Sequence, residues 1–173
     1  MNVEIRESTG SDIAELELLY PAAFPEEALL PLVRSLLADP ATALSLVATI
    51  DGTIVGHAML TRCRLTGSPL GAALLGPVAV APGAQRHGIG SLLIETGLQR
   101  LRDARAEIVL VLGDPAYYQR FGFAPESRVS PPFRLPAEWA DAWQCLALGE
   151  RGPQEKVVLV VPPQWEDPAL WGP

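Results

Sequence analysis

The sequence LLGPVAVAPGAQRHGIGSLLIETGLQRLRDAR, residues 74–105, decides the fold of this chain. It begins with an apolar run that predicts a strand, and a Pro82-Gly83 turn follows. Apolar residues then recur at intervals of three and four, which is the spacing of one face of a helix. These residues are Ile89, Leu93, Ile94, Leu98 and Leu101. The stretch therefore predicts a strand, a glycine-bearing loop and an amphipathic helix, in that order.

The loop that precedes this helix is suited to binding phosphate. The first amides of a helix have no acceptor within it, and the helix dipole places partial positive charge there. Gly88 and Gly90 carry no side chain, so backbone N–H groups can lie against phosphate oxygens. Arg86, and His87 when it is protonated, would add positive charge. A turn that needs glycine only for its geometry explains the same residues, because short glycine motifs are common.

Two segments carry a resemblance to a known family. Gln85-x-x-Gly88-x-Gly90, after a strand that ends in Val78-Ala79-Val80, resembles the acetyl-CoA signature of the GCN5-related N-acetyltransferase (GNAT) family. The segment Gly113–Phe123, with its Tyr117-Tyr118 pair before Gly122-Phe123, is similar to the family's second signature and to the YhbS-like subgroup of bacterial acetyltransferases. Two signatures in the right order are far more specific than either alone. The resemblance is strong over residues 74–123 and thin on either side.

The resemblance implies the acyl-CoA N-acyltransferase (GNAT) fold, an α/β (α+β) domain with a mixed, twisted sheet of about six or seven strands and flanking helices. One such domain over residues 1–173 is expected, in agreement with the length. In the family, the fourth and fifth strands splay apart, and the thioester arm of acetyl-CoA pairs with the fourth strand. Pro77 interrupts the apolar strand where that irregularity would lie. An irregular edge strand is the alternative.

Acetyl-CoA is the co-substrate that the resemblance implies. The expected cofactor contacts are Val78, Ala79, Val80, Gln85, Arg86, His87, Gly88, Ile89, Gly90, Ser91 and Tyr118. No metal is expected, because no metal-ligand spacing links Cys63 or Cys145 to either histidine. Two cysteines are also too few for a disulfide framework, so reduced core thiols are expected. Cys63 lies outside both signatures, which leaves a route through an acyl-cysteine without support.

Tyr118 holds the position of the family's general-acid tyrosine. When an amine attacks the thioester, a phenol O–H can protonate the departing thiolate. The alternative is a packed aromatic whose hydroxyl is hydrogen-bonded. The general base is open, because many family members use a glutamate on the fourth strand and residues 72–81 contain no acidic residue. His57 is a candidate because histidine titrates near neutrality, with a structural histidine or a water relayed to Glu26 as alternatives.

Two helices are expected before the first hairpin. Ser11-Asp12 can cap the first, and Pro21 and Pro25 are expected to interrupt the chain after it. The second is expected from Glu26 to Ala38, with glutamates in its first turn. In the resembling fold this region covers the acceptor side of the active site. The candidate substrate contacts are Phe24, Glu26 and Glu27, with a solvated helix start as the alternative for the glutamates.

The remaining strands follow from local patterns. Asp51-Gly52 between the apolar runs 44–50 and 53–60 predicts an antiparallel hairpin. Residues 107–112 form a continuous apolar run that predicts a buried strand parallel to the fourth. Two late strands are expected at 143–148 and 156–161, and the resemblance implies that they pair as a closing hairpin.

Composition narrows the class of partner. A net charge of −7 argues against a nucleic-acid surface and is compatible with a cationic amine as acceptor. The first residues lack a basic-then-apolar signal, and no apolar run approaches membrane-spanning length, so no membrane contact and a cytoplasmic location are expected. Ordinary packing is expected for the tryptophans, with an acceptor pocket or a homodimer contact as alternatives. They are Trp139, Trp143, Trp165 and Trp171.

The residues and the resemblance together predict an N-acetyltransferase. It would transfer an acetyl group from acetyl-CoA to a primary amine by direct attack in a ternary complex. The acceptor, a small molecule or a protein amine, is not identified, because fold does not fix substrate. The alternative is a CoA-binding regulatory module of the same fold, motivated by the missing acid on the fourth strand. A P-loop nucleotide hydrolase is disfavoured, because no Gly-Lys-Ser/Thr follows the glycines.

Overall fold

The structure is a computed structural model that describes residues 2–173. Its residues gather into two compact units. The first unit comprises Met1–Leu60 and Gly76–Arg100, and the second comprises Thr61–Leu75 and Leu101–Pro173. The boundary passes through strands β3 (Thr53–Leu65) and β4 (Ser68–Val80), so each of these strands contributes to both units.

The sheet is mixed, which confirms the expected fold class. Its hydrogen-bonded order is β1-β2-β3-β4-β5-β8-β6, with β9 beside β3 and β7 beside β9. The strands besides β3 and β4 are β1 (Val3–Glu7), β2 (Ala43–Ile50), β5 (Ile108–Leu112), β6 (Ala124–Pro125), β7 (Val129–Ser130), β8 (Trp143–Ala147) and β9 (Val157–Val160). Residues 2–173 contain nine strands, where about six or seven were expected. Part of the difference lies in β6 and β7, which have two residues each and carry no detectable periodicity.

Helices flank the sheet. The α-helices are α1 (Ile13–Ala23), α2 (Leu30–Leu37), α3 (Ile89–Asp103) and α4 (Pro115–Tyr118). Short 3-10 helices span Gly10–Asp12, Pro82–Ala84, Gln119–Phe121, Ala137–Ala142, Pro163–Trp165 and Pro168–Leu170. The predicted amphipathic helix after the glycine loop is α3, and it begins at Ile89 as the spacing indicated.

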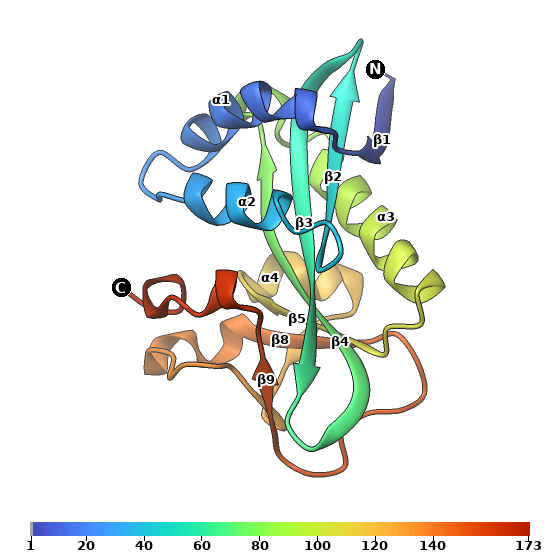
Figure 1. Ribbon diagram of the computed structural model, residues 1–173, viewed down its shortest axis with the longest axis vertical. Coiled ribbons are helices and arrows are strands. Elements are labelled where there is room, and N and C mark those ends of the chain that lie inside the picture. Colours follow the sequence, from blue (N-terminus) through green and yellow to red (C-terminus); the bar gives the residue numbers. More distant parts are fainter. Residues whose placement is uncertain (1) are drawn as a thin grey trace. The chain divides into compact units, whose positions relative to one another are not determined.

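In the first unit, helices cover both faces of β2 and β3 (Figure 1). Adjacent residues of a strand point to opposite faces, so Gly56 and His57 of β3 face different helices. The His57 ring contacts Tyr20 of α1. A Cβ on Gly56 would lie 2.9 Å from a methyl carbon of Leu93 in α3. The absence of a side chain at Gly56 therefore lets α3 pack closely on the sheet.

The β2–β3 hairpin is confirmed. Asp51 and Gly52 have φ angles of 50° and 79°, the left-handed values that a two-residue hairpin turn needs at both positions. β1 pairs antiparallel with β2, from Val3 opposite Ile50 to Glu7 opposite Leu46. β1 and the hairpin therefore form the part of the sheet against which α1 and α2 pack.

Prolines place the helix ends differently from expectation. Pro21 lies inside α1, so the expected interruption there is wrong. The helix ends at Ala23 with Phe24 as its C-cap, because the residue before a proline, here Pro25, is pushed out of the helical region. α2 begins at Leu30 and not at Glu26. A start at Glu26 would have put Pro31 in the helix interior, where its ring clashes with the preceding turn, whereas the first turn tolerates it.

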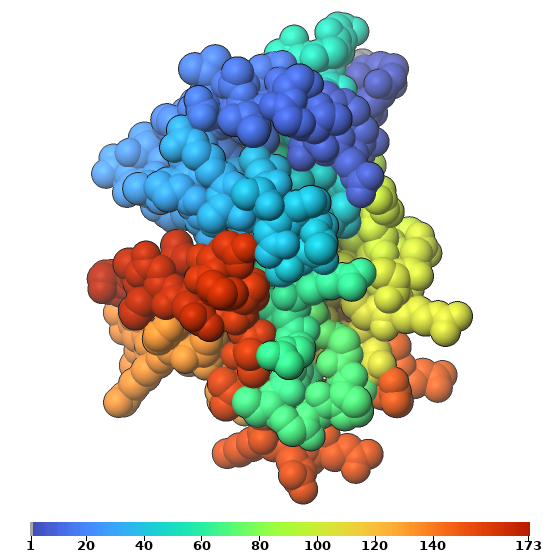
Figure 2. Space-filling view, viewed as in Figure 1, coloured from blue at the N-terminus to red at the C-terminus, as the bar shows by residue number. Residues whose placement is uncertain are grey.

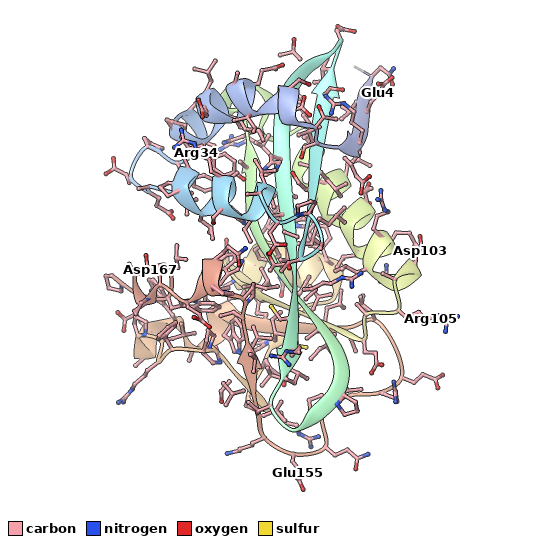
Figure 3. The ribbon with its side chains drawn as sticks, viewed as in Figure 1. Glu4, Arg34, Asp103, Arg105, Glu155 and Asp167 are labelled. Carbon is pink, nitrogen blue, oxygen red and sulfur yellow. The ribbon has the colours of Figure 1, made fainter. Side chains whose placement is uncertain are left out.

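An exposed ion pair joins the two N-terminal helices. The Arg34 guanidinium of α2, labelled in Figure 3, donates to Glu17 Oε1 of α1 from Nη2 at 2.9 Å and from Nε at 3.1 Å. Both side chains are about half exposed. Solvent and salt screen such a pair, so its contribution to stability is at most about 1 kcal/mol. The apolar cluster beneath the helices therefore holds them more strongly. It contains Leu16, Leu19, Tyr20, Val33, Val47, Ile54 and Ala79.

In the second unit, the late strands do not form the expected closing hairpin. β8 pairs antiparallel with β5, from Ile108 opposite Ala147 to Leu112 opposite Trp143. β6 takes the other edge of β8. Because a strand has two edges and both are occupied, β9 cannot pair with β8. It pairs instead with the end of β3, with Leu159 opposite Leu65.

Three tryptophans form the centre of the C-terminal part of this unit. Trp143, Trp165 and Trp171 are 2%, 8% and 1% exposed, which confirms ordinary core packing for them. The Trp171 ring lies 5.7 Å from Trp143 and 5.9 Å from Trp165, centroid to centroid, and its indole N–H donates to the Trp165 carbonyl at 2.9 Å. In Figure 2 the C-terminal segment (red) lies against orange residues of the same unit.

Replacing Trp171 with Ala should therefore destabilise the protein by about 3–5 kcal/mol, through the lost contacts and the cavity left behind. Urea unfolding measures the change. The control is Leu18→Ala, because Leu18 is 75% exposed and its loss should cost less than about 0.5 kcal/mol. Equal effects of the two substitutions would contradict the central role of Trp171.

Candidate functional site

The N-terminus of α3 presents a set of unpaired backbone amides in the first unit. Arg86 and Gly88 have φ angles of 65° and 77°, so two left-handed residues flank His87. Such alternation turns successive N–H groups toward one side. The Leu92 amide donates to the Gly88 carbonyl at 3.0 Å, so the four amides before Leu92 precede the first helical acceptor. These amides, at Gly88, Ile89, Gly90 and Ser91, and those of Arg86 and His87 are termed the α3 nest.

Side-chain and backbone bonds hold the loop that carries the nest. The Gln85 side-chain amide donates to the Val80 carbonyl at 3.2 Å, which ties the loop to the end of β4. The Ala84 amide donates to the Ala81 carbonyl at 2.8 Å. His87 Nδ1 lies 3.3 Å from the Ala84 carbonyl oxygen. The side chains of Arg86 and His87 are exposed, so their charge can reach an approaching anion.

The last part of β4 lies directly before this loop. The parallel register with β5 runs from Ala72 opposite Ile108 to Leu75 opposite Val111, and β4 continues to Val80. Within this continuation the Gly76–Pro77 peptide is cis and Gly76 has a φ of 137°, so the backbone is irregular where the proline indicated. Val78 and Val80 are half-buried, and the Ala79 side chain is buried.

The predicted acceptor residues lie at the end of α1 and just after it. The Phe24 ring is half-buried and stacks on Tyr20, with centroids 6.1 Å apart. Glu26 lies in the turn after Phe24, and Glu27 lies in the irregular segment before α2. Both glutamates are exposed. Because α2 begins only at Leu30, the expected place of these glutamates in its first turn is wrong.

Tyr118 lies at the end of α4 in the second unit. Asp114 accepts the Ala116 amide at 2.9 Å, and Pro115 occupies the first position of the helix, as the sequence indicated. The helix continues as a 3-10 turn to Phe121 and ends at Gly122, whose φ of 100° suits glycine. A Cβ on Gly113 would overlap the Tyr118 ring, so Gly113 allows the tyrosine to lie against the end of β5.

The surroundings of Tyr118 keep its hydroxyl protonated. Burial raises the pKa of Tyr118 above the ordinary phenol value, with Tyr117 and Asp114 adding to the effect. Three aromatic rings pack around it, with centroid distances of 5.1 Å to Tyr117, 6.3 Å to Phe121 and 5.8 Å to Phe123. Within residues 2–173 its hydroxyl has no hydrogen-bond partner. A protonated phenol with a free O–H is what proton donation requires.

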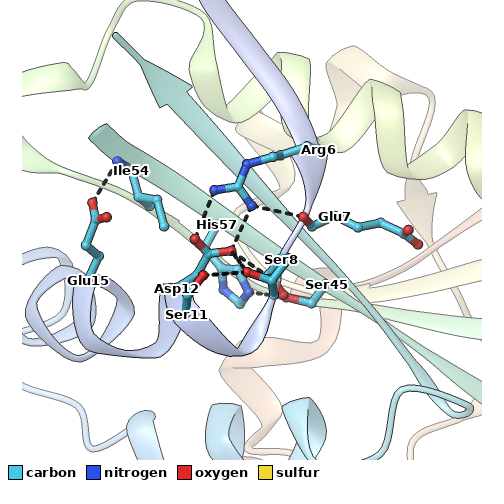
Figure 4. Close-up of polar contacts among 10 residues, drawn as sticks. Arg6, Glu7, Ser8, Ser11, Asp12, Glu15, Ser45, Ile54 and His57 are labelled. Carbon is cyan, nitrogen blue, oxygen red and sulfur yellow. Dashed lines mark hydrogen bonds and ion pairs between the residues drawn. The ribbon is translucent and has the colours of Figure 1, made fainter. Parts of the chain in front are cut away.

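His57 lies in a buried polar network of the first unit (Figure 4). The Tyr20 hydroxyl is 2.6 Å from Nδ1, and Ser45 Oγ is 2.7 Å from Nε2. Ser8 Oγ in turn donates to Ser45 Oγ at 2.6 Å. The imidazole is 0% exposed, and burial lowers the pKa of His57 to about 3. Both ring nitrogens are therefore engaged and the ring is neutral, which supports a structural histidine over a general base.

An ion pair between the exposed Arg6 and the buried Asp12 lies beside this network. Arg6 donates to both carboxylate oxygens of Asp12, at 2.7 and 2.9 Å, and the Thr9 amide donates to Oδ2 at 2.7 Å. Hydrogen bonding to Arg6 lowers the pKa of Asp12 to about 2. Asp12 occupies the N-cap position of α1, as expected, but its side chain makes no cap bond to this helix. Its carboxylate instead joins β1 to the start of α1.

Sequence reasoning missed these partners. The pairs Arg6–Asp12 and Tyr20–His57 share no motif, and the residues of the second pair are 37 positions apart. Arg6 alternates with apolar residues in β1, a pattern that indicates a strand and carries no sign of an ion pair. The one usable signal was the spacing of Thr9 and Asp12, three residues apart directly before a helix, which is typical of local side-chain-to-backbone bonding.

The cysteines are free thiols without activating neighbours. Burial raises the pKa of Cys63 and of Cys145 to about 12, so each is protonated at neutral pH and a poor nucleophile. Nowhere in residues 2–173 do three or more metal-ligating side chains gather in a group that could hold an ion. Among the same residues, every helix is too short or too polar to cross a membrane.

The α3 nest is suited to binding an anion. Unpaired amides and a helix dipole favour an anion, and Gly88 keeps side-chain atoms away from its approach. A methyl group at Gly88 would meet no atom within 4 Å, so the space beside this glycine is open. The chemistry of this donor set is complementary to phosphate oxygens.

A mixed sheet whose fourth strand leads through a glycine loop into α3 defines a protein of the N-acyltransferase fold. The family model for the acetyltransferase (GNAT) family matches residues 12–123. The chain therefore belongs to the GNAT acetyltransferase family, which confirms the resemblance seen in the two signatures.

Known relatives agree with this assignment. The chain is 40% identical over 149 residues to the uncharacterized N-acetyltransferase YjhQ of Escherichia coli K12, covering 82% of this chain and 80% of YjhQ. It is 32% identical over 120 residues to the uncharacterized N-acetyltransferase YhbS of the same strain, covering 69% and 72%. These similarities also confirm the expected YhbS-like subgroup.

Two solved structures resemble the chain over nearly its whole length. A GNAT family acetyltransferase from Brucella melitensis in complex with acetyl-CoA has a TM-score of 0.76 and 35% identity, covering 95% of this chain and 99% of that one. The YhbS protein of Escherichia coli in complex with CoA has a TM-score of 0.86 and 25% identity, covering 96% and 93%.

The buried His57 predicts a pH dependence of stability. The unfolded chain binds a proton at His57 near pH 6.5, whereas the folded chain does so near pH 3. The free energy of unfolding that the neutral His57 contributes is therefore fully present above pH 6.5 and declines as the pH falls toward 3. Between pH 6.5 and 4.5 the loss should be about 2 kcal/mol, measured by urea unfolding.

His57→Gln, which cannot titrate, should lose this part of the pH dependence. His87→Gln is the matched control, because His87 is exposed and its replacement should leave the dependence as in the parent protein. An unchanged slope in the His57 variant would contradict the burial of a neutral imidazole.

Proposed function

We propose that this chain is an N-acetyltransferase that moves the acetyl group of acetyl-CoA to a primary amine by direct attack within a ternary complex. The observation that carries the proposal is the α3 nest, formed by the left-handed φ values of Arg86 and Gly88 in a chain of the GNAT family. The complexes of the Brucella and Escherichia proteins with acetyl-CoA and CoA support the same donor for this chain.

The residues of the first unit would bind and orient the donor. The α3 nest donates hydrogen bonds to the diphosphate, and the exposed Arg86 guanidinium adds charge. The irregular end of β4, Val78–Val80, offers backbone groups to the pantetheine arm. Acetyl-CoA supplies the acetyl group as a thioester that an amine can attack.

Tyr118 would act as the general acid of the second unit. Its raised pKa keeps the O–H in place at neutral pH, and the hydroxyl has no partner among residues 2–173 that would compete for it. A phenol in this state can donate its proton to the departing thiolate, a role that is worth about 10²- to 10⁴-fold in rate.

The acceptor would be an amine that arrives as a cation, since alkylamines are protonated at neutral pH. The exposed carboxylates of Glu26 and Glu27, after the half-buried ring of Phe24, are candidates to attract it. His57 is a poor candidate for the base because its ring is buried, neutral and bonded at both nitrogens. Water relayed to Glu26 is the proposed route for the amine proton.

A second candidate function is a CoA-responsive regulatory module of the same fold. It is favoured by two observations: residues 72–81 hold no acidic side chain, and His57 is sequestered. A screen of small amines, polyamines, amino acids and peptide N-termini for release of free CoA thiol separates the two functions. An acetyltransferase releases thiol with at least one amine, whereas a regulatory module binds CoA without turnover.

Gly88→Ala should weaken CoA binding about tenfold. An L-residue at a φ of 77° costs about 1–2 kcal/mol, and relaxation of that strain would turn the amides away from the diphosphate. Calorimetric titration with CoA measures the affinity. Gly83→Ala is the matched control, since Gly83 lies nearby in open space at an ordinary φ. Equal affinity of both variants and the parent protein would remove the α3 nest from the binding site.

Tyr118→Phe should lower kcat by about 100-fold or more while the CoA affinity stays within about twofold, because only the proton donor is lost. The amine with the highest rate in the screen serves as acceptor, and thiol release is followed under steady state. A variant with the parent kcat would exclude Tyr118 as the acid. A parallel loss of CoA affinity would instead indicate a packing role.

A further inference from the structure

Gln144 of β8 carries a buried hydrogen-bond acceptor without a donor. The side chain is 1% exposed. Its Nε2 donates to the Gly113 carbonyl at 3.1 Å and, with a longer bond, to the Ala142 carbonyl at 3.4 Å. Within residues 2–173 its Oε1 has no partner. Exchange of the two amide atoms would place an oxygen against two carbonyl oxygens, so the contacts fix the orientation.

This acceptor lies on the same face of the β5–β8 pair as Tyr118. Gln144 is opposite Val111 in the antiparallel register, and opposite residues point to the same face. The ladder extends to Gly113, whose amide donates to the Ala142 carbonyl at 3.0 Å, so Gly113 shares the face of Val111. The Tyr118 ring covers that side of Gly113. Gly113 therefore packs against the Tyr118 ring at its Cα and accepts a hydrogen bond from the Gln144 side chain at its carbonyl.

The two side chains have complementary chemistry. The Tyr118 hydroxyl is a donor, and Gln144 Oε1 is a buried acceptor to which no group of residues 2–173 donates. An unsatisfied buried acceptor destabilises the folded protein, and a Met or Leu side chain of similar volume would avoid that cost. An unsatisfied acceptor such as Gln144 Oε1, close to the candidate catalytic Tyr118, is suited to a ligand that donates a hydrogen bond from an N–H group. The position also lies outside residues 12–123, which the family model covers.

We propose that Gln144 Oε1 accepts a hydrogen bond from the nitrogen of the acceptor amine and so positions that nitrogen on the face of Tyr118. The inference rests on the proposed acetyltransferase function and adds the residue that recognises the amine. The ligand class is an N–H-bearing amine. Quaternary ammonium ions, which carry the charge without an N–H, are excluded. Gln144 stays neutral and binds the amine without removing its proton.

The test uses the full chain saturated with CoA, whose free thiol cannot acetylate the probe. Methylammonium chloride is the probe, because it is the smallest alkylamine and fits wherever an amine nitrogen fits. Tetramethylammonium chloride is the control ion. The side-chain carbonyl carbon resonance of Gln144, observed by carbon-13 NMR, should move saturably with methylammonium and stay unchanged with tetramethylammonium.

Substitution provides a second readout. Gln144→Met keeps the side-chain volume and should raise the methylammonium Kd at least about tenfold, the worth of one hydrogen bond of 1.4 kcal/mol, with the CoA affinity unchanged. Gln164→Met is the matched control, because Gln164 is a half-buried glutamine at a different place in the second unit and its replacement should leave both affinities unchanged. The NMR titration of the parent protein stands even where a variant fails to fold.

The outcomes distinguish a failure of the Gln144 inference from a failure of the proposed acetyltransferase function. CoA binding with no Gln144 response to methylammonium, or with an equal response to tetramethylammonium, overturns the inference alone. Failure of the protein to bind CoA overturns the proposed function, and the inference with it.

Discussion

The unpaired amides at the start of α3 are the constraint on which the functional account depends. A helix leaves its first N–H groups without acceptors, and in this chain those of α3 follow directly on a glycine-bearing loop. The left-handed φ of Arg86 is strained for a residue with a side chain, and strain of this kind persists only where the surroundings enforce it. The Gln85–Val80 bond supplies part of that enforcement by tying the loop to β4.

Polar side chains centred on the buried Asp12 and His57 place the helices of the first unit relative to its strands. Arg6 and Asp12 join β1 to α1, and the Tyr20–His57–Ser45 chain joins α1 to β3 and β2. Breaking one partner of such a chain leaves the others buried and unsatisfied, which makes the arrangement specific as well as stable. The second unit contrasts with this scheme. There the tryptophan cluster is satisfied, whereas Gln144 keeps one acceptor open on the face of Tyr118.

Features set by neighbouring residues could be predicted from the sequence. The Asp51-Gly52 turn, the start of α3 and the cap of α4 by Asp114 each depend on a few adjacent residues. Features set by distant partners could not. β9 pairs with β3 because β6 already occupies the free edge of β8, and no local pattern encodes that competition. The orientation of the Gln144 side chain, which leaves Oε1 without a donor, likewise depends on a distant partner, because its Nε2 donates to the Gly113 carbonyl.

The central claim is that the amides of residues 86–91 hold the diphosphate of CoA. It is tested most directly by following the backbone amide resonances of the nitrogen-15-labelled protein during a titration with CoA. The account predicts that the amides of Arg86 to Ser91 show the largest saturable shifts, and that pantetheine, which lacks the diphosphate, leaves them nearly unmoved. Saturation of the protein with CoA while these amides stay in place would contradict it.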